Sequence, residues 1–298
     1  MPREPRAPND NRYDPKDPLD INAMNSSLLA NRLLSSINKR QSAYLSDRAL
    51  KRLNIQCTGL DLNTGMPSDG SETLIRPFPM AKIHSIFKER QPWNKYKIIH
   101  DHILGPDDGA QGVLYSIYGH LNSGDFDDDF DFGDCDPPPT LIQHTDWQLR
   151  DMEWDEGERL LRRPVGLASL PRWTVMDVLD KIDGVTPHVS CLLMDRAPLR
   201  DAQLSSAEIC CILAVTFRRF RQREYRNHRF IPVTIVSAAG CRVRIVQGYV
   251  DPQEDGMRVR KSPILDLHDD VEQNQKQIEL LTSWCIGETV GDTKLKTT

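Results

Sequence analysis

The chain has 298 residues, of which 39% are hydrophobic and 27% charged, and its formal net charge at pH 7 is −5. This composition is ordinary for one large or two small globular domains, and the net negative charge disfavours binding of nucleic acid or of an acidic membrane by the molecule as a whole. No basic segment followed by an apolar run opens the chain, and no apolar run approaches the ~20 residues of a membrane-spanning helix. The seven cysteines include no Cys-x-x-Cys pair, so we expect a cytoplasmic or nuclear protein whose thiols are core residues.

The first part of the chain is predicted to lie outside the main domain. Residues 1–21 are rich in proline, aspartate, asparagine and arginine, which predicts disorder. Residues 22–72 are predicted to form a helical arm and a turn-rich linker. Leu29, Leu33 and Ile37 recur there at helical spacing, and the pattern leaves open how the arm docks.

Residues 73–288 are predicted to form a single α+β domain, in which several helices pack a mostly antiparallel sheet, and residues 289–298 a flexible tail. The composition of the first part of this domain favours strands. The candidate strands are Lys95–Leu104, Val113–Leu121, Thr140–Thr145 and Trp147–Trp154.

An acidic segment interrupts these strands at residues 123–139. Its seven aspartates, three phenylalanines and three consecutive prolines predict an exposed loop. Asp127, Asp129 and Asp131 alternate as calcium ligands do, but an EF-hand requires glycine at its sixth position and glutamate at its twelfth, where this chain has phenylalanine and proline. The sequence therefore favours a solvated loop or an acidic–aromatic docking segment.

Two further helices and a buried strand are predicted in the rest of the domain. Thr174–Asp183 has the capping pattern of a short helix that ends at Gly184. His188–Met194 is predicted to be a buried strand, and Asp269–Cys285 the last helix, which ends at Gly287.

The strongest fold signal is a long helix followed by three strands in the stretch 205–267. Ser205 and Glu208 have the spacing of a capping box, and the first half of the helix is apolar on all sides, which predicts burial. Three strand-like segments follow, at Phe230–Ser237, Cys241–Val250 and Met257–Leu265. Pro232 lacks a ladder donor, so the first of them is an edge strand or pairs only from Val233 onward.

Arginines alternate with apolar residues along the second and third of these strands. Because a slip of one residue would bury them, we expect these arginines on an outer, exposed face. The candidate partner-binding residues are Arg242, Arg244, Arg258 and Arg260. The expected partner is an acidic protein or peptide, since such a segment needs only a few paired charges. A separate arginine-rich run, Arg218–Arg229, favours a solvated helix end.

His100 and His102 are the best candidates for metal ligands, because an H-x-H pair on a strand points both imidazoles to one face. The other residues available to such a site are His84, His120, Asp107 and Asp108. Nothing in their spacing brings them together, so we predict that purified protein holds no stoichiometric transition metal.

An enzyme is the alternative to an interaction protein. Glu208, Asp251 and Lys261 have the residue types of a metal-dependent phosphodiesterase, but the acid-x-Lys triplet is absent because Val259-Arg260 precede the lysine. The sequence has no Gly-x-Ser-x-Gly elbow, Walker-type loop, dinucleotide fingerprint or kinase signature. We therefore expect a non-catalytic interaction or accessory protein without a cofactor. An enzyme without a recognisable motif, such as a metal-dependent hydrolase, is the second hypothesis.

Five segments from about Arg172 onward carry a family resemblance. They are Tyr225–His228, Ile231–Ile235, Arg244–Asp251, Arg260–Leu265 and Trp284–Glu288. Through them the chain resembles a group of filamentous-fungal proteins. The resemblance implies a fungal source and an accessory role, in some cases beside secondary-metabolite gene clusters, and it carries over no catalytic residue.

Overall fold

A computed structural model of the chain describes residues 13–90, 109–122, 139–150, 162–164, 171–267 and 271–295. The candidate strand Lys95–Leu104 and all of the predicted acidic loop except Pro139 lie outside the described residues.

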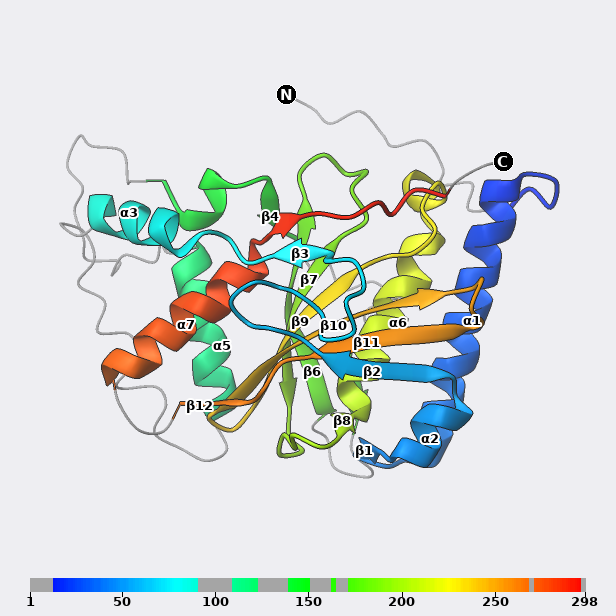
Figure 1. Ribbon diagram of the computed structural model, residues 1–298, viewed down its shortest axis with the longest axis horizontal. Helices are drawn as coiled ribbons and strands as arrows, with labels where there is room; N and C mark the ends of the chain where they lie inside the picture. The colour runs from blue at the N-terminus through cyan, green and yellow to red at the C-terminus, as the bar shows by residue number, and fades with distance from the viewer. Residues whose placement is uncertain are drawn as a thin grey trace.

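A mixed sheet forms the centre of the α+β fold, and in the described residues it has nine strands (Figure 1). The main path runs in the order β2 (Ile55–Gly59), β11 (Gly256–Lys261), β10 (Arg242–Asp251), β9 (Val233–Ala239), β7 (Val189–Asp195), β6 (Pro171–Lys181) and β4 (Trp147–Leu149). Two short strands pair beside this path, β12 (Leu265–Asp266) with β10 and β5 (Arg162–Pro164) with β6. Only the β7–β9 and β11–β2 pairs are parallel among these strands, which confirms a mostly antiparallel sheet.

Helices cover both faces of this sheet. α1 (Pro18–Arg40) and α6 (Ser206–Phe220) pack on one face, and α3 (Met80–Arg90), α5 (Gly109–Asn122) and α7 (Val271–Cys285) on the other (Figure 1). Successive residues of a strand therefore face two different cores. In β10, Ile245 lies in the core of α5 and α7, whereas Val246 lies in the core of α1 and α6.

The predicted helix and meander are confirmed. Ser205 Oγ accepts the N–H of Glu208 at 3.2 Å, and the Glu208 carboxylate accepts the N–H of Ser205 at 2.8 Å, which completes the capping box. α6 approaches β10 so closely that a Cβ added at Gly248 would lie 2.8 Å from Ile212 Cδ1. β9 begins at Val233 and is a central strand, so Pro232 precedes the paired part.

The N-terminal region is ordered where the structure describes it. Residues 13–21 contain the Asp17 cap and first turn of α1, so the prediction of disorder is wrong for them. α1 packs along α6 through the same core, and β2 joins the main sheet next to β11. Residues 22–72, expected as an arm and linker, thus contribute a helix and a strand to the central core.

Three of the predicted elements have the wrong type. Val113–Leu121 lies within the helix α5, because its apolar residues repeat at intervals of four and pack one helix face. Most of Thr174–Asp183 lies in the strand β6, where burial on both faces overrides the capping pattern. Thr140–Thr145 contains the 3₁₀ helix η1 (Leu141–His144). β4 occupies the start of the predicted strand Trp147–Trp154.

The remaining predictions at this end of the chain are largely confirmed. β7 matches the buried strand expected at His188–Met194, and α7 matches the last helix, with Ile278, Leu281 and Cys285 buried. Among the described helices, none combines the length and apolarity that crossing a lipid bilayer requires.

Two small strand pairs tie distant segments to the domain. β1 (Tyr44–Leu45) pairs with β8 (Leu204–Ser205), and β13 (Glu288–Thr289) pairs with β3 (Ile75–Arg76). The flexible tail expected at residues 289–298 is therefore wrong as far as Leu295, whose N–H donates to the Asn227 C=O at 3.0 Å.

His228 fastens this C-terminal segment to the loop after β6. Its Nδ1 lies 2.8 Å from Thr293 Oγ1 and its Nε2 3.1 Å from the Val185 C=O. A neutral ring satisfies both contacts when Nε2–H donates to the carbonyl and Nδ1 accepts from the hydroxyl. Burial, followed by the charge of Lys294, lowers the pKa of His228 to about 4. Burial likewise lowers the pKa of His188 to about 4.

These two histidines predict a loss of stability in weak acid. The unfolded chain protonates histidine at about pH 6.5, so the contribution of the neutral rings is present above that pH and is lost as the pH falls towards about 4. We expect a lower urea midpoint at pH 5 than at pH 7.5. His228→Gln should be less stable than the parent at pH 7.5 and should show a smaller difference between the two pH values. An unchanged difference would contradict the assignment.

Candidate functional site

Arg244, a predicted partner-binding residue, is fully buried. Its Nε and Nη2 donate to the two carboxylate oxygens of Glu208 at 2.7 and 2.6 Å. Its remaining donors bind the backbone C=O of Arg200 and Gln203 at 2.9 and 3.0 Å. The expected outer-face position is therefore wrong for Arg244, because its face of β10 is covered by α6.

Arg260 is also buried, with 2% of its surface exposed. It donates to Gln247 Oε1 and to Ser71 Oγ, each at 3.0 Å. Burial lowers the pKa of this guanidinium from its usual value. The outer-face prediction is wrong for Arg260 as well, because the loop that carries Ser71 covers it.

Arg242 and Arg258 stay half-buried at the surface. Arg258 forms a bidentate pair with Glu254 at 2.9 and 2.7 Å. Arg242 donates to the Leu199 C=O at 2.9 Å and lies 3.8 Å from Asp201. The four arginines therefore do not form one basic face, and each already has partners within the chain.

The arginine-rich run after α6 is only partly solvated. Arg219 is buried and forms an ion pair with Asp180. Arg226, just after the 3₁₀ helix η3 (Arg223–Tyr225), is buried against Asp20 at 2.9 Å. The expectation of a solvated helix end is wrong for these two residues, which anchor β6 and the start of α1.

The phosphodiesterase residues do not converge. The Glu208 carboxylate is occupied by Ser205 and Arg244, and Asp251 accepts from Arg229 at 2.5 Å at the other end of β10. Arg244 and Asp251 are seven residues apart in this strand, which is about 23 Å at roughly 3.3 Å per residue. No single cation could contact both carboxylates.

The proposed metal ligands His100 and His102 lie outside the described residues. Two histidines that were available to such a site have other partners: His84 Nε2 lies 3.0 Å from Glu279 Oε2, and His120 Nδ1 2.7 Å from the Ser116 C=O. The part of the chain that the structure describes holds no cluster of three or more metal-ligating side chains. The expectation of a metal-free protein stays a prediction.

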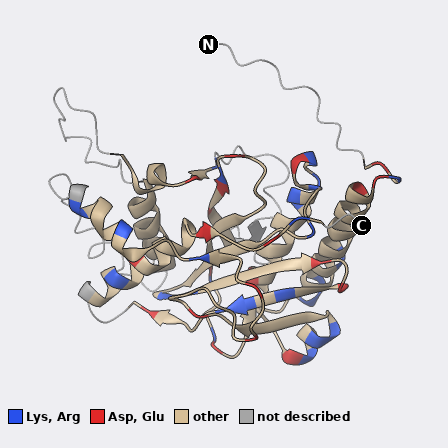
Figure 2. Ribbon diagram, turned by 45° about the horizontal axis from the view of Figure 1, so that its top comes forward, with Lys and Arg blue, Asp and Glu red and all other residues tan. Residues whose placement is uncertain are grey.

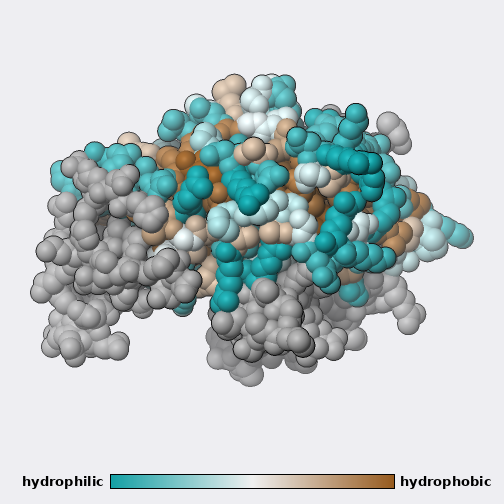
Figure 3. Space-filling model, turned by 90° about the horizontal axis from the view of Figure 1, so that it is seen from below, coloured by the Kyte–Doolittle hydropathy of each residue, from teal (hydrophilic) through white to brown (hydrophobic). Residues whose placement is uncertain are grey.

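A group of exposed cations that the sequence analysis missed lies around α2 (Asp47–Arg52), where Figure 2 shows Lys and Arg in blue. Figure 3 shows the molecule from below, with hydrophilic residues in teal. We call it the α2 basic surface, formed by Lys39, Arg40, Arg48, Lys51, Arg52 and Arg196. β1 joins the end of α1 to α2, and the loop after β7 meets it there, because Tyr44 Oη–H donates to the Pro198 C=O at 2.6 Å.

The α2 basic surface is not neutralised by the chain itself. Residues 39–52 contain five cations and one carboxylate, a net charge of +4 in a chain whose net charge is −5. Within the described ranges, none of its six side chains forms an ion pair. Cations at the ends of α1 and α2 complement the helix dipoles, but Arg48 and Arg196 lie outside those last turns. The charge run Asp47-Arg-Ala-Leu-Lys-Arg52 is the signal that would have revealed this surface.

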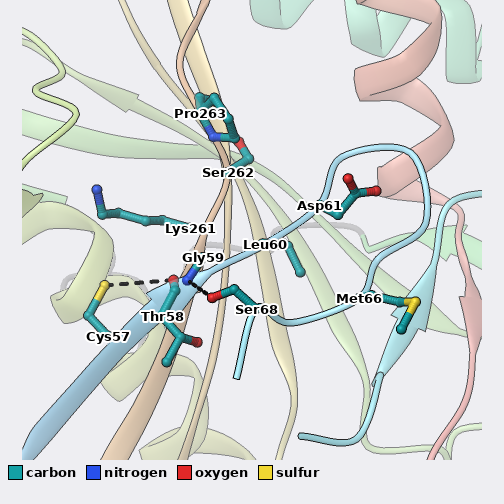
Figure 4. Close-up of a pocket in the computed structure, with 10 residues that line it drawn as sticks. All are labelled: Cys57, Thr58, Gly59, Leu60, Asp61, Met66, Ser68, Lys261, Ser262 and Pro263. Carbon is teal, nitrogen blue, oxygen red and sulfur yellow. Dashed lines mark hydrogen bonds between the residues drawn. The ribbon is translucent and has the colours of Figure 1, made fainter. Parts of the chain in front are cut away.

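The edge strand β2 begins directly after α2, and a groove of about 520 Å³ lies along its C-terminal end (Figure 4). Apolar side chains of Leu60, Met66 and Pro263 line it, together with Cys57 and Lys261. Met66 is 60% exposed, and burial raises the pKa of the Cys57 thiol, so this thiol acts as an apolar wall.

Comparison of the chain with protein-family models, with curated proteins and with solved structures found no match.

The different positions of Arg244 and Arg258 predict different costs of substitution. Arg244→Met leaves the buried Glu208 carboxylate without its cation, which should lower the free energy of unfolding by about 3–5 kcal/mol. Arg258→Met removes the same guanidinium from a surface pair and should cost less than about 1 kcal/mol. Urea denaturation at pH 7 measures both. Equal, small losses would show that the Glu208–Arg244 pair is not buried in solution.

Proposed function

We propose that this protein is a non-catalytic interaction protein that binds an acidic segment of a partner protein at the α2 basic surface. The observation that carries the proposal is the set of six exposed cations without ion-pair partners in the described chain. Their summed potential reaches about 8 Å into solvent at physiological ionic strength and attracts anionic partners. The acidic partner expected from the sequence is retained, but its binding site moves from the β10–β11 arginines to α2.

An acidic protein segment fits this surface better than nucleic acid does. Affinity for DNA depends on counterions released by several phosphate contacts along the duplex. The α2 basic surface has six cations, and the rest of the molecule is net negative. A peptide with a few carboxylates can bind to a small group of cations and does not need a row of them. Mixed charge around the site gives such binding specificity.

The alternative of an enzyme is less well supported. Glu208 and Asp251 are occupied by arginines, and the groove beside β2 has a single carboxylate, Asp61, which accepts from Thr64 within its own turn. Lys261, the amine in the groove lining, donates to the Asp201 C=O, and burial raises the pKa of the Cys57 thiol, so this pair does not supply an activated nucleophile.

We further propose a cytoplasmic or nuclear protein of a filamentous fungus, with an accessory role. The reducing compartment is supported by the cysteines of the described residues, which are all free thiols and mostly buried. The fungal source and the accessory role rest on the resemblance of the C-terminal block.

Charge reversal on α2 tests the proposal. Lys51→Glu with Arg52→Glu should weaken binding of a fluorescein-labelled octa-aspartate peptide by roughly tenfold or more at 50 mM NaCl, since it replaces two attractions by repulsions. The matched control is Arg221→Glu with Arg223→Glu, two exposed cations after α6, which gives the same change in net charge and should leave binding within about twofold. Fluorescence anisotropy measures both.

Two results would refute the proposed function. One is equal weakening by the two double variants, which would show a response to net charge alone. The other is tighter binding of a 12-base-pair DNA duplex than of octa-aspartate at 150 mM NaCl, which would make nucleic acid the partner.

A further inference from the structure

We infer that the partner's acidic segment binds as an added strand on the outer edge of β2, with an apolar side chain in the groove and carboxylates on the α2 basic surface. This inference rests on the proposed function and specifies the conformation and chemistry of the ligand. Three features support it: the direction in which the backbone N–H and C=O groups of β2 point, the groove, and the cations beside them.

The N–H and C=O groups of β2 point alternately towards β11 and away from the sheet, and those of Cys57 point away. Met257 N–H donates to the Asn54 C=O at 3.0 Å, and Leu60 N–H donates to the Lys261 C=O at 2.9 Å. In a parallel ladder every second residue bonds to the same neighbour, so the even-numbered residues of β2 face β11. The N–H and C=O of the odd-numbered residues, Cys57 among them, face away from the sheet.

Gly59 confirms this alternation. Its outward N–H donates to Ser68 Oγ and its C=O accepts the Ser68 N–H, each at 2.9 Å. The edge is thus closed at this end by the loop that carries Ser68 (Figure 4). No described residue bonds the outward N–H or C=O of Cys57. A peptide backbone alongside β2 would satisfy both groups, as in other cases of strand addition.

The two ends of β2 differ in chemistry, and this difference determines which residue types the ligand needs and how far apart they are. The groove with Leu60, Met66 and Pro263 lies at the C-terminal end, and α2 with Lys51 and Arg52 lies at the N-terminal end. Four residues of extended chain separate Ile55 from Gly59, about 13 Å at roughly 3.3 Å per residue. The ligand therefore needs an apolar residue and acidic residues about four positions apart.

A second copy of the chain is a poorer occupant than a partner's acidic peptide. Twofold symmetry requires β2 to pair antiparallel with β2 of the other molecule. Pairing centred on Cys57 would then set Ile55 of each copy opposite Gly59 of the other, whose outward N–H and C=O are already bonded to Ser68. Nucleic acid has no peptide backbone to pair with the outward N–H and C=O, and its phosphates do not suit an apolar groove. The combination of an open edge, a groove and unpaired cations favours an extended acidic peptide.

Synthetic peptides test the inference in the full-length protein. The probe has the sequence of residues 125–136 of this chain with Cys135→Ser, because it combines seven aspartates with three phenylalanines and places Asp128 four positions before Phe132. Its control replaces all three phenylalanines by serine, which keeps the seven aspartates and removes the apolar side chains. We expect the probe to bind at least tenfold more tightly than the control at 150 mM NaCl, measured by fluorescence anisotropy.

The backbone contact is tested by removing single hydrogen-bonding groups. Cys57→Pro deletes the outward N–H, which an edge strand tolerates, and should abolish the preference for the probe, whereas Cys57→Ala should keep it. Two N-methylated probes, methylated at alternate amides in opposite phase, should differ at least tenfold, since only every second amide of an added strand faces β2. The methylated probes decide the question even where Cys57→Pro does not fold.

The outcomes separate the two proposals. Equal binding of probe and control together with equal binding of the two methylated probes would overturn strand addition. The proposed function would survive that result if Lys51→Glu with Arg52→Glu still weakens both peptides. If that double variant has no effect on either peptide, both proposals fail. A parent protein that is dimeric through β2, made monomeric by Cys57→Pro, would identify a second copy as the occupant and would overturn the inference.

Discussion

The buried ion pair between Glu208 and Arg244 fastens the start of α6 to β10 in the central sheet. Glu208 caps the start of α6, and Arg244 lies on β10, where each of its three guanidinium nitrogens donates a hydrogen bond. Two charges removed from water are tolerated only when their remaining hydrogen bonds are satisfied, and here the capping box and the loop carbonyls satisfy them. The close approach at Gly248 then brings the apolar face of α6 onto the same strand. The ion pair and the apolar contact thus both join α6 to β10.

Other arginines repeat this use of a buried cation between segments that are distant in sequence. Arg219 links α6 to β6 through Asp180, and Arg226 links the following turn to the start of α1 through Asp20. Arg260 links β11 to β10 and to the loop at Ser71. Arginine suits these positions because its planar fork binds several acceptors in fixed directions. The arginines of an arginine-rich sequence can therefore be buried in the interior of a protein as well as exposed on its surface.

Local signals in the sequence were sufficient for the elements that they concern directly. The capping box at Ser205 and the strands that follow needed no long-range information, and both are present. Predicting which face of each strand is exposed did need long-range information, because β10 is covered by α6 on one side and by α5 and α7 on the other. The same cause turned Thr174–Asp183 from an expected helix into most of β6, because packing between two layers overrides local propensity. The open edge of β2 could not be predicted from the sequence either. The position of this strand depends on pairing between residues 55–59 and 256–261, which are far apart in the chain.

The α2 basic surface differs from these sites because folding does not require it. An exposed ion pair contributes only about 0–1 kcal/mol, so the fold loses little by leaving these cations unpaired, even though the chain has more carboxylates than cations. What the fold gains is a local positive potential beside the edge of β2. Edge strands are usually protected against chance pairing, and this one is short and closed by Ser68 at one end. Under the proposed function the positive charge adds a further restriction, because it would repel other basic segments and attract acidic ones. In the proposed complex, cations beside an edge whose Ile55 and Cys57 backbone groups are open would attract an acidic partner before any backbone hydrogen bond forms.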